Sequence, residues 1–278
     1  MNKIYEVVTD KIISLLEQNI IPWRKPWDVQ FPMNMITGKQ YRGINIMLLS
    51  YSGYQSPYWL TYKQAQTLKG NVRKGEKGSM VVYWNFVKIQ SDNDVEKKIP
   101  FMKYYTVFNV EQCEGIPVPE ASKIEFNPLT ECEAVINNFL NKPLIEHGGN
   151  RASYSVKQDL IRMPHKETFN SVQGYYGTLF HEMTHSTGNA SRLNRKTITE
   201  SNGFGSENYS KEELIAEIGA SFLCAVAGIE NQTIENQANY IKNWLLRLKD
   251  DKQMIISASS QAQKATDYIL GNVPVEVV

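Results

Sequence analysis

Five consecutive residues in the second half of the chain, His181-Glu182-Met183-Thr184-His185, form an H-E-x-x-H sequence. Two histidines four residues apart project from one face of a helix, so both imidazoles can bind the same metal ion. The glutamate between them can then take a proton from a water whose pKa the metal lowers. The chain has only four histidines, and two of them fall in this pattern. The pattern therefore predicts a metal site with Glu182 as the general base.

A third protein ligand is needed, and a downstream carboxylate is the best candidate. The other two histidines, His147 and His165, lie upstream in loop-like sequence and do not extend the motif. Glu213 and Glu217 are four residues apart on a predicted helix and share a face. This spacing resembles the gluzincin arrangement, in which the first acid is a ligand and the second orients a zinc histidine. We expect Glu213 on the metal, Glu217 behind a histidine, and Glu212 as an ordinary solvated charge.

The expected ion follows from this ligand set. Two imidazoles and one carboxylate with an open position suit Zn²⁺, although Mn²⁺ or another divalent transition metal also fits these donors. An intact general base favours a working site over a structural one, but it does not prove turnover.

The elements that would position these side chains are mainly helical. Ser210 is a candidate N-cap, with Glu213 three residues later as its capping-box partner. Two short extended pieces precede the motif, and the first of them reads as an edge strand. The expected helices span 131–141, 171–186 and 210–227, one or two more follow in the last forty residues, and the extended pieces span 152–156 and 160–164. We therefore expect a mainly helical domain with a small edge sheet at 129–278.

Charge and aromatic residues are divided unevenly along the chain. Residues 1–110 contain 15 Lys and Arg against 8 Asp and Glu, a net charge of +7, whereas residues 111–278 contain 15 against 21, a net charge of −6. The first 110 residues also hold 17 of the 30 aromatic residues. Opposite charge in the two halves favours two domains. A basic, aromatic-rich half suits a single-stranded nucleic-acid binder, and equally a small β-rich domain with an aromatic core and a solvated basic face.

The first half has a mixed pattern of elements. Helical periodicity covers 2–19, and Thr61 is a candidate cap for a helix that runs through Leu68. Alternating sequence at 80–89 and 103–110 predicts a β-hairpin. Three prolines and no helical period mark 115–128 as a linker. The expected fold class is α+β, with a small basic domain at 1–114 joined by this linker to the helical domain.

Several classes of protein are excluded by composition. No run approaches 18 apolar residues, so no transmembrane helix or other association with a membrane is expected. The first residues lack the apolar core of a signal peptide. Three cysteines without C-x-x-C spacing fit reduced thiols in a cytoplasm and argue against a disulfide framework.

Several motifs together resemble the ArdC antirestriction proteins of conjugative plasmids and related mobile elements. They extend over nearly the whole chain, and they lie at 21–27, 37–45, 59–65, 72–78, 179–188, 191–195 and 212–217. The resemblance implies an N-terminal domain that binds single-stranded DNA, shared with some plasmid primases, and a C-terminal zincin-like metallopeptidase domain. It also implies that the protein protects incoming plasmid DNA from host restriction in the recipient cell.

The chemistry of the first half agrees with DNA binding. Basic side chains can neutralise phosphates and aromatic rings can stack on bases; the candidates are Arg24, Lys25, Arg42, Lys69, Arg73, Lys74 and Lys77, with Trp23, Trp27, Tyr41 and Trp59. Trp23 and Trp27 are the tryptophans expected to be exposed, and Trp84 is the one expected in the core. No base-reading helix stands out, so binding without strong sequence preference is expected.

Two other functions remain open. In one, the protein is not an enzyme: the metal is structural, and the chain coats single strands or blocks a restriction enzyme. In the other, the first domain alone defines a replication accessory protein. If the centre is catalytic, a host restriction enzyme or another protein is the candidate substrate.

Overall fold

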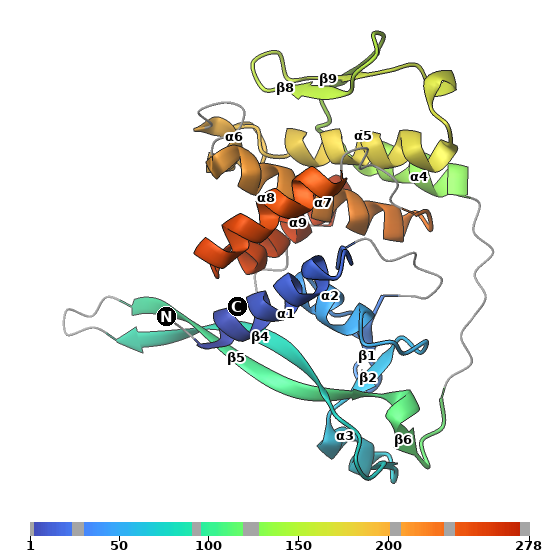
Figure 1. The fold of residues 1–278 in the computed structure, drawn as a ribbon, viewed down its shortest axis with the longest axis vertical. Coiled ribbons are helices and arrows are strands. Elements are labelled where there is room, and N and C mark those ends of the chain that lie inside the picture. Colours follow the sequence, from blue (N-terminus) through green and yellow to red (C-terminus); the bar gives the residue numbers. More distant parts are fainter. Residues whose placement is uncertain are drawn as a thin grey trace. The chain divides into compact units, whose positions relative to one another are not determined.

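The computed structural model describes residues 3–23, 31–90, 96–118, 128–200, 207–230 and 237–272. The chain divides into two units: Met1–Val8 with Val29–Ser122, and Thr9–Asp28 with Lys123–Val278. Both units combine helices with small sheets, which confirms the predicted α+β class with two domains (Figure 1). The predicted boundary differs in one respect, because residues 9–28 group with the second unit.

The first unit is built on a four-stranded sheet in the order β1-β2-β5-β4. Its strands are β1 (Met33–Asn34), β2 (Tyr58–Leu60), β4 (Ser79–Gln90) and β5 (Glu96–Asn109). The predicted hairpin is confirmed: β4 pairs antiparallel along its whole length with Glu96–Val107 of β5, and the two strands form a long curved ribbon (Figure 1). A smaller antiparallel pair joins β3 (Asn71–Val72) to β6 (Cys113–Glu114), which follows a 3-10 turn at Val110–Gln112.

Two short helices pack on this sheet. The apolar run 44–50 forms α2 (Ile44–Ser50), and Asn45 attaches it to β4 by exchanging hydrogen bonds of 2.8 and 2.7 Å with the backbone of Val82. Thr61 caps α3 (Tyr62–Thr67) as predicted, and the structure adds a full capping box: the Thr61 hydroxyl accepts from the Gln64 amide, and the Gln64 side chain accepts from the Thr61 amide.

The tryptophans are distributed differently from the prediction. Trp23 is 1% exposed in the second unit, where its ring meets Trp244 edge to face at 5.2 Å. Trp59 is 2% exposed and packs in the first unit with Leu49 and Val81. Trp84, by contrast, is 46% exposed. The expectations for Trp23 and Trp84 are therefore wrong, and neither Trp23 nor Trp59 presents a face to a base.

The second unit contains most of the helices. Its described elements are α1 (Lys3–Glu17, from Thr9 onward), α4 (Pro128–Asn138), α5 (Val172–Ser186), α6 (Lys196–Thr199), α7 (Glu207–Val226), α8 (Gln237–Asp250), α9 (Met254–Ile269) and a 3-10 turn at Lys166–Thr168. A three-stranded sheet in the order β7-β9-β8 contains β7 (Leu144–His147), β8 (Ser153–Ser155) and β9 (Leu160–Met163), so the predicted edge strand is confirmed. None of the described helices is long and apolar enough to span a bilayer.

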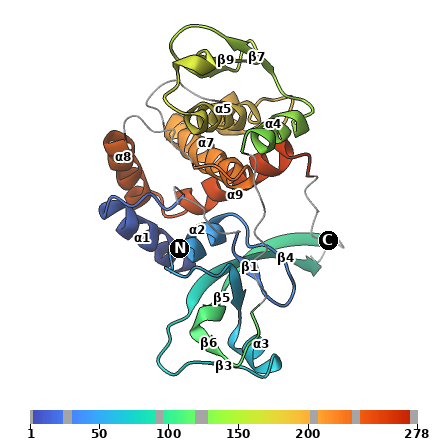
Figure 2. The same ribbon diagram turned by 90° about the vertical axis from the view of Figure 1, so that its right-hand side faces the viewer.

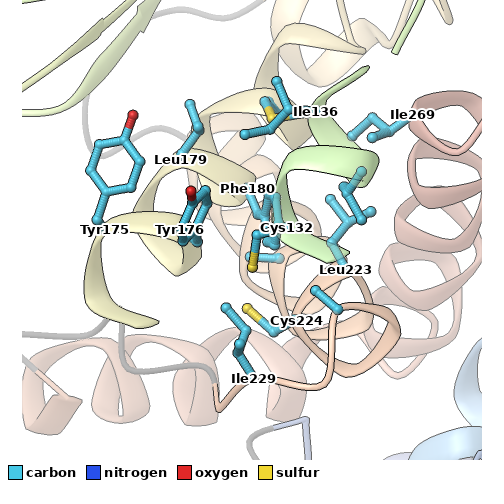
Figure 3. Close-up of a cluster of buried hydrophobic side chains, with 14 of the residues drawn as sticks. Cys132, Ile136, Tyr175, Tyr176, Leu179, Phe180, Leu223, Cys224, Ile229 and Ile269 are labelled. Atoms are coloured by element: carbon cyan, nitrogen blue, oxygen red, sulfur yellow. The ribbon is translucent and has the colours of Figure 1, made fainter. Parts of the chain in front are cut away.

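The central helix of this unit is α7, which packs against both α5 and α9 (Figure 2). It begins at Glu207 and not at the predicted cap Ser210, so the capping-box prediction for Glu213 is wrong. Apolar side chains from four helices meet in one buried cluster; Figure 3 shows among them Cys132 of α4, Phe180 of α5, Leu223 of α7 and Ile269 of α9.

A glycine allows α5 and α7 to approach closely. A Cβ added to Gly219 of α7 would lie 2.5 Å from Cγ2 and 2.8 Å from Oγ1 of Thr184 on α5. Thr184 is fully buried and cannot swing away, and its hydroxyl donates to the Phe180 carbonyl. The separation of the two helices therefore depends on the absence of a side chain at position 219.

We predict that Gly219→Ala destabilises the protein by about 1–3 kcal/mol, because it overpacks this contact. Urea unfolding gives the free energy of unfolding. The Thr184→Ala/Gly219→Ala double variant removes the atoms that clash, so Gly219→Ala should cost much less in that background. Equal costs in the two backgrounds would show that the contact does not limit the approach of the helices.

Candidate metal centre

The two histidines of the H-E-x-x-H sequence lie side by side on α5. This helix begins after Ser171, whose hydroxyl accepts from the Gly174 amide at 3.0 Å, as expected of an N-cap. The Nε2 atoms of His181 and His185 are 3.0 Å apart, and both side chains are almost buried. The i, i+4 spacing therefore directs both imidazoles to one point.

Glu213 of α7 faces this point from the neighbouring helix. Its carboxylate oxygens lie 3.6 Å from Nε2 of His181 and 3.5 Å from Nε2 of His185. One atom from each of the three residues can be chosen so that all lie within 4.8 Å of one another. Two imidazole nitrogens and a carboxylate oxygen are the donors that zinc and related divalent ions take in proteins, so the residues present fit such an ion.

Each histidine also has a carboxylate behind it. The Nδ1 atom of His181 lies 3.4 Å from a carboxylate oxygen of Glu217, and Nδ1 of His185 lies 3.2 Å from one of Glu212. All these carboxylates come from α7, and Glu212 and Glu217 are 3% and 5% exposed. Such partners fix the tautomer and the orientation of a ligand histidine.

Glu212 is the residue that sequence reasoning missed. It was expected to be solvated, but it is buried between His185 and Arg195, whose guanidinium donates to its two oxygens at 2.6 and 3.1 Å. Thr197 also donates to it. Arg195, itself 5% exposed, donates in addition to the Thr184 carbonyl at the end of α5. Helical spacing could not reveal this pairing, because Arg195 lies in the loop that follows α5.

The electrostatics of the cluster suit a cation. Burial alone would lower the pKa of His181, but Glu213 and Glu217 raise it well above its ordinary value. Burial likewise opposes the charged form of His185, yet Glu212 and Glu213 raise its pKa to about 9. Burial would raise the pKa of Glu213, and the two imidazoles instead hold it far below its usual range. The carboxylates are thus arranged to stabilise positive charge at this point.

The general-base candidate, Glu182, lies in α5 directly after His181 and is 8% exposed.

The predicted DNA-binding residues of the first half differ in their exposure to solvent. Arg42, Lys69, Lys74 and Lys77 are exposed. Tyr41 is partly buried against the Trp59 cluster, and exposed Arg73 pairs with Glu76 at 2.7 Å. Arg24, Lys25 and Trp27 lie outside the described residues.

The second unit therefore has the organisation of a zincin-like domain: an H-E-x-x-H helix and a carboxylate on a packed second helix. Comparison with known proteins agrees with this class. Residues 131–261 match the family of zincin-like metallopeptidases, and residues 2–108 match the N-terminal domain of the antirestriction factor ArdC.

Solved structures and curated proteins show the same relationship over nearly the whole chain. Two crystal structures of the antirestriction protein ArdC from plasmid R388, one metal-free and one Mn(II)-bound, are 41% identical in sequence; they have TM-scores of 0.78 and 0.80 and cover 96% and 98% of this chain and 97% and 98% of theirs. The uncharacterized protein y4eC of Sinorhizobium fredii is 34% identical, and the match covers 96% of this chain and 91% of that protein.

Two Escherichia coli proteins named DNA primase TraC are 34% and 36% identical over 96% of this chain. The chain spans only 27% and 20% of their length. The chain belongs to the ArdC antirestriction family, and its second unit carries a zincin-like domain with a donor set for a divalent metal.

We predict that Glu212→Gln weakens divalent-metal binding by about 10–100-fold, because His185 loses the carboxylate that orients it. Competitive titration with a metal chelator measures the affinity. Glu207→Gln is the matched control, since Glu207 lies on the same helix but is exposed and pairs with Lys211.

Glu212→Gln also leaves Arg195 buried without a carboxylate, which can cost about 3–5 kcal/mol of stability. The Arg195→Gln/Glu212→Gln double variant removes both charges and should still bind metal weakly. Wild-type affinity in this folded double variant would contradict a role for Glu212 at the centre.

A separate prediction concerns Glu217. Glu217→Ala should weaken metal binding by about 10–100-fold without removing a ligand, so the stoichiometry should stay at one ion per chain. A metal-bound crystal structure tests the assignment directly: Glu217 on the ion, with Glu213 turned away, would reverse it.

Proposed function

We propose that this chain is an antirestriction protein of a mobile element that binds single-stranded DNA with its first unit and hydrolyses a peptide bond at the centre in its second unit. The observation that carries the proposal is the convergence of His181, His185 and Glu213, with a buried carboxylate behind each histidine and with Glu182 directly after His181 in α5. A structural ion needs no general base. Membership of the ArdC family supports the antirestriction role and action in the bacterial cytoplasm, where restriction takes place.

In this proposal His181, His185 and Glu213 hold one divalent ion. Zinc is proposed from the donor chemistry, and the Mn(II)-bound structure of the R388 protein supports manganese as an alternative. When bound, the ion would polarise the substrate carbonyl and acidify a water. Glu182 accepts the proton of that water and delivers it to the departing amine. Glu212 and Glu217 hold the two imidazoles in place, so the ligands need no rearrangement during the reaction.

DNA binding is proposed for the first unit on charge and family grounds. The two ranges of the first unit, Met1–Val8 and Val29–Ser122, contain 12 Lys and Arg against 8 Asp and Glu, a net charge of +4, and the exposed Lys69, Lys74 and Lys77 can release counterions from phosphates. Contacts to phosphates do not read sequence, so weak sequence preference is expected.

A non-enzymatic function is the second candidate. A similar region recurs within two proteins named DNA primase, where it forms 27% and 20% of the length. That recurrence favours a module that binds DNA in different settings. In this alternative the metal is structural, and protection comes from coating single strands or blocking a restriction enzyme.

We predict that Glu182→Gln lowers peptide hydrolysis by about 10²–10⁴-fold, because it removes the group that accepts the proton. Metal content and DNA affinity should stay unchanged, since Glu182 is proposed neither to bind the metal as a ligand nor to contact DNA. Fluorescent casein serves as a general protease substrate, and transfer of unmodified plasmid into a restricting host measures protection.

The two readouts separate the candidates. Loss of both hydrolysis and protection supports the peptidase. Full protection by a Glu182→Gln variant would establish the non-enzymatic alternative, whether or not the wild type cleaves casein.

A further inference from the structure

The two faces of the β2–β5–β4 sheet in the first unit are covered differently. Side chains alternate between faces along each strand, and directly paired residues share a face. On one face, Trp59, Val81 and Val107 are buried together with Leu49 of α2. This face is the core side of the sheet beneath α2.

The opposite face carries aromatic side chains that are partly exposed. Trp84 pairs in register with Met102, and Tyr104 and Phe108 follow along β5 at two-residue steps that keep them on this face. Tyr62, at the start of α3, meets Phe108 edge to face at 6.5 Å. Trp84, Tyr104 and Tyr62 are 46%, 59% and 51% exposed.

These residues form one track along the sheet, which we call the aromatic track: Trp84, Tyr104, Phe108 and Tyr62. From Tyr104 to Phe108 it extends for about 14 Å along β5 at the usual rise per residue. Gly78 keeps the space beside it free, because a Cβ there would lie 2.2 Å from Cγ2 of Thr106 and 3.1 Å from the Phe108 ring. Several large apolar side chains exposed in a row are uncommon on a soluble protein and mark a binding surface.

Charge indicates what this surface binds. Lys63 directly follows Tyr62, and Lys77 directly precedes Gly78, which faces the Phe108 ring; both lysines are exposed. Positive charge thus lies beside the aromatic rings at one end of the track. Stacking rings bordered by cations suit a polyanion with exposed flat bases, which single-stranded DNA provides and duplex DNA does not.

We propose that single-stranded DNA binds along the aromatic track, with bases stacked on Trp84, Tyr104 and the Tyr62–Phe108 pair and with phosphates near Lys63 and Lys77. The inference rests on the proposed DNA-binding function and assigns it to one face of one sheet. It replaces the buried rings of Trp23 and Trp59 as stacking platforms.

The structure offers a matched control on the same two strands. Tyr83 and Tyr105 are the sequence neighbours of Trp84 and Tyr104, so they lie on the other face, where their rings are 6.0 Å apart. They are 44% and 48% exposed. Both pairs are therefore aromatic, lie at neighbouring positions along the ribbon and have similar exposure, and they differ in the face they occupy.

The experiment uses the full chain and a fluorescein-labelled 20-nucleotide oligo-dT, with binding followed by anisotropy at moderate salt. Tyr104→Ala and Trp84→Ala should each raise Kd by about 5- to 150-fold, the loss expected when one stacked base loses its platform. Tyr105→Ala and Tyr83→Ala should leave Kd within about twofold. Tyr104→Phe keeps the ring and should bind as the wild type does. Circular dichroism verifies that each variant is folded.

The possible failures can be told apart. If the wild type does not bind the oligonucleotide, the proposed DNA-binding function fails and this inference fails with it. If the wild type binds and Tyr105→Ala weakens binding as much as Tyr104→Ala, or if neither Tyr104→Ala nor Trp84→Ala has an effect, the function stands and the assignment to this face is overturned.

Discussion

The close contact between α5 and α7 is the constraint on which the second unit depends. Gly219 lets the two helices approach until Thr184 fills the space between them. The same approach brings Glu213 opposite His181 and His185, and it places Glu212 and Glu217 behind the two imidazoles. A wider spacing would leave the buried Glu213 and Glu217 without their histidine partners and would separate Glu212 from His185, at a cost far above that of a lost apolar contact.

Local spacing explains why the centre could be predicted from the sequence and where the prediction ended. His181 and His185 converge because helical geometry alone sets an i, i+4 pair, and Glu213 with Glu217 follows the same rule. Glu212 points to a different side of α7, where its partner comes from the loop after α5. A contact between a helix and a separate loop leaves no characteristic spacing in the sequence. The pairing of Glu212 with Arg195 could therefore be found only in the tertiary structure.

The first unit shows the same limit for burial. The hairpin and the Thr61 cap were predictable, since alternation and cap chemistry are local. Exposure of the tryptophans was not. Trp84 lies in an apolar run of a strand, yet its side chain is 46% exposed. Trp23 lies among prolines and basic residues, yet it is buried against Trp244, more than two hundred positions away in the sequence. Neighbouring residue types therefore predicted the strand and not which of its side chains is covered.

The shared carboxylate of Glu212 also restricts how this family can change over evolutionary time. One side chain neutralises Arg195 and orients His185, so a mutation at 212 disturbs both a buried charge and a metal ligand. A mutation at 195 leaves a buried carboxylate beside the centre instead. Either single step passes through a less fit intermediate, so lineages should keep or exchange these two positions together. Glu217, whose buried contact is with one histidine, has more freedom to drift to another acceptor.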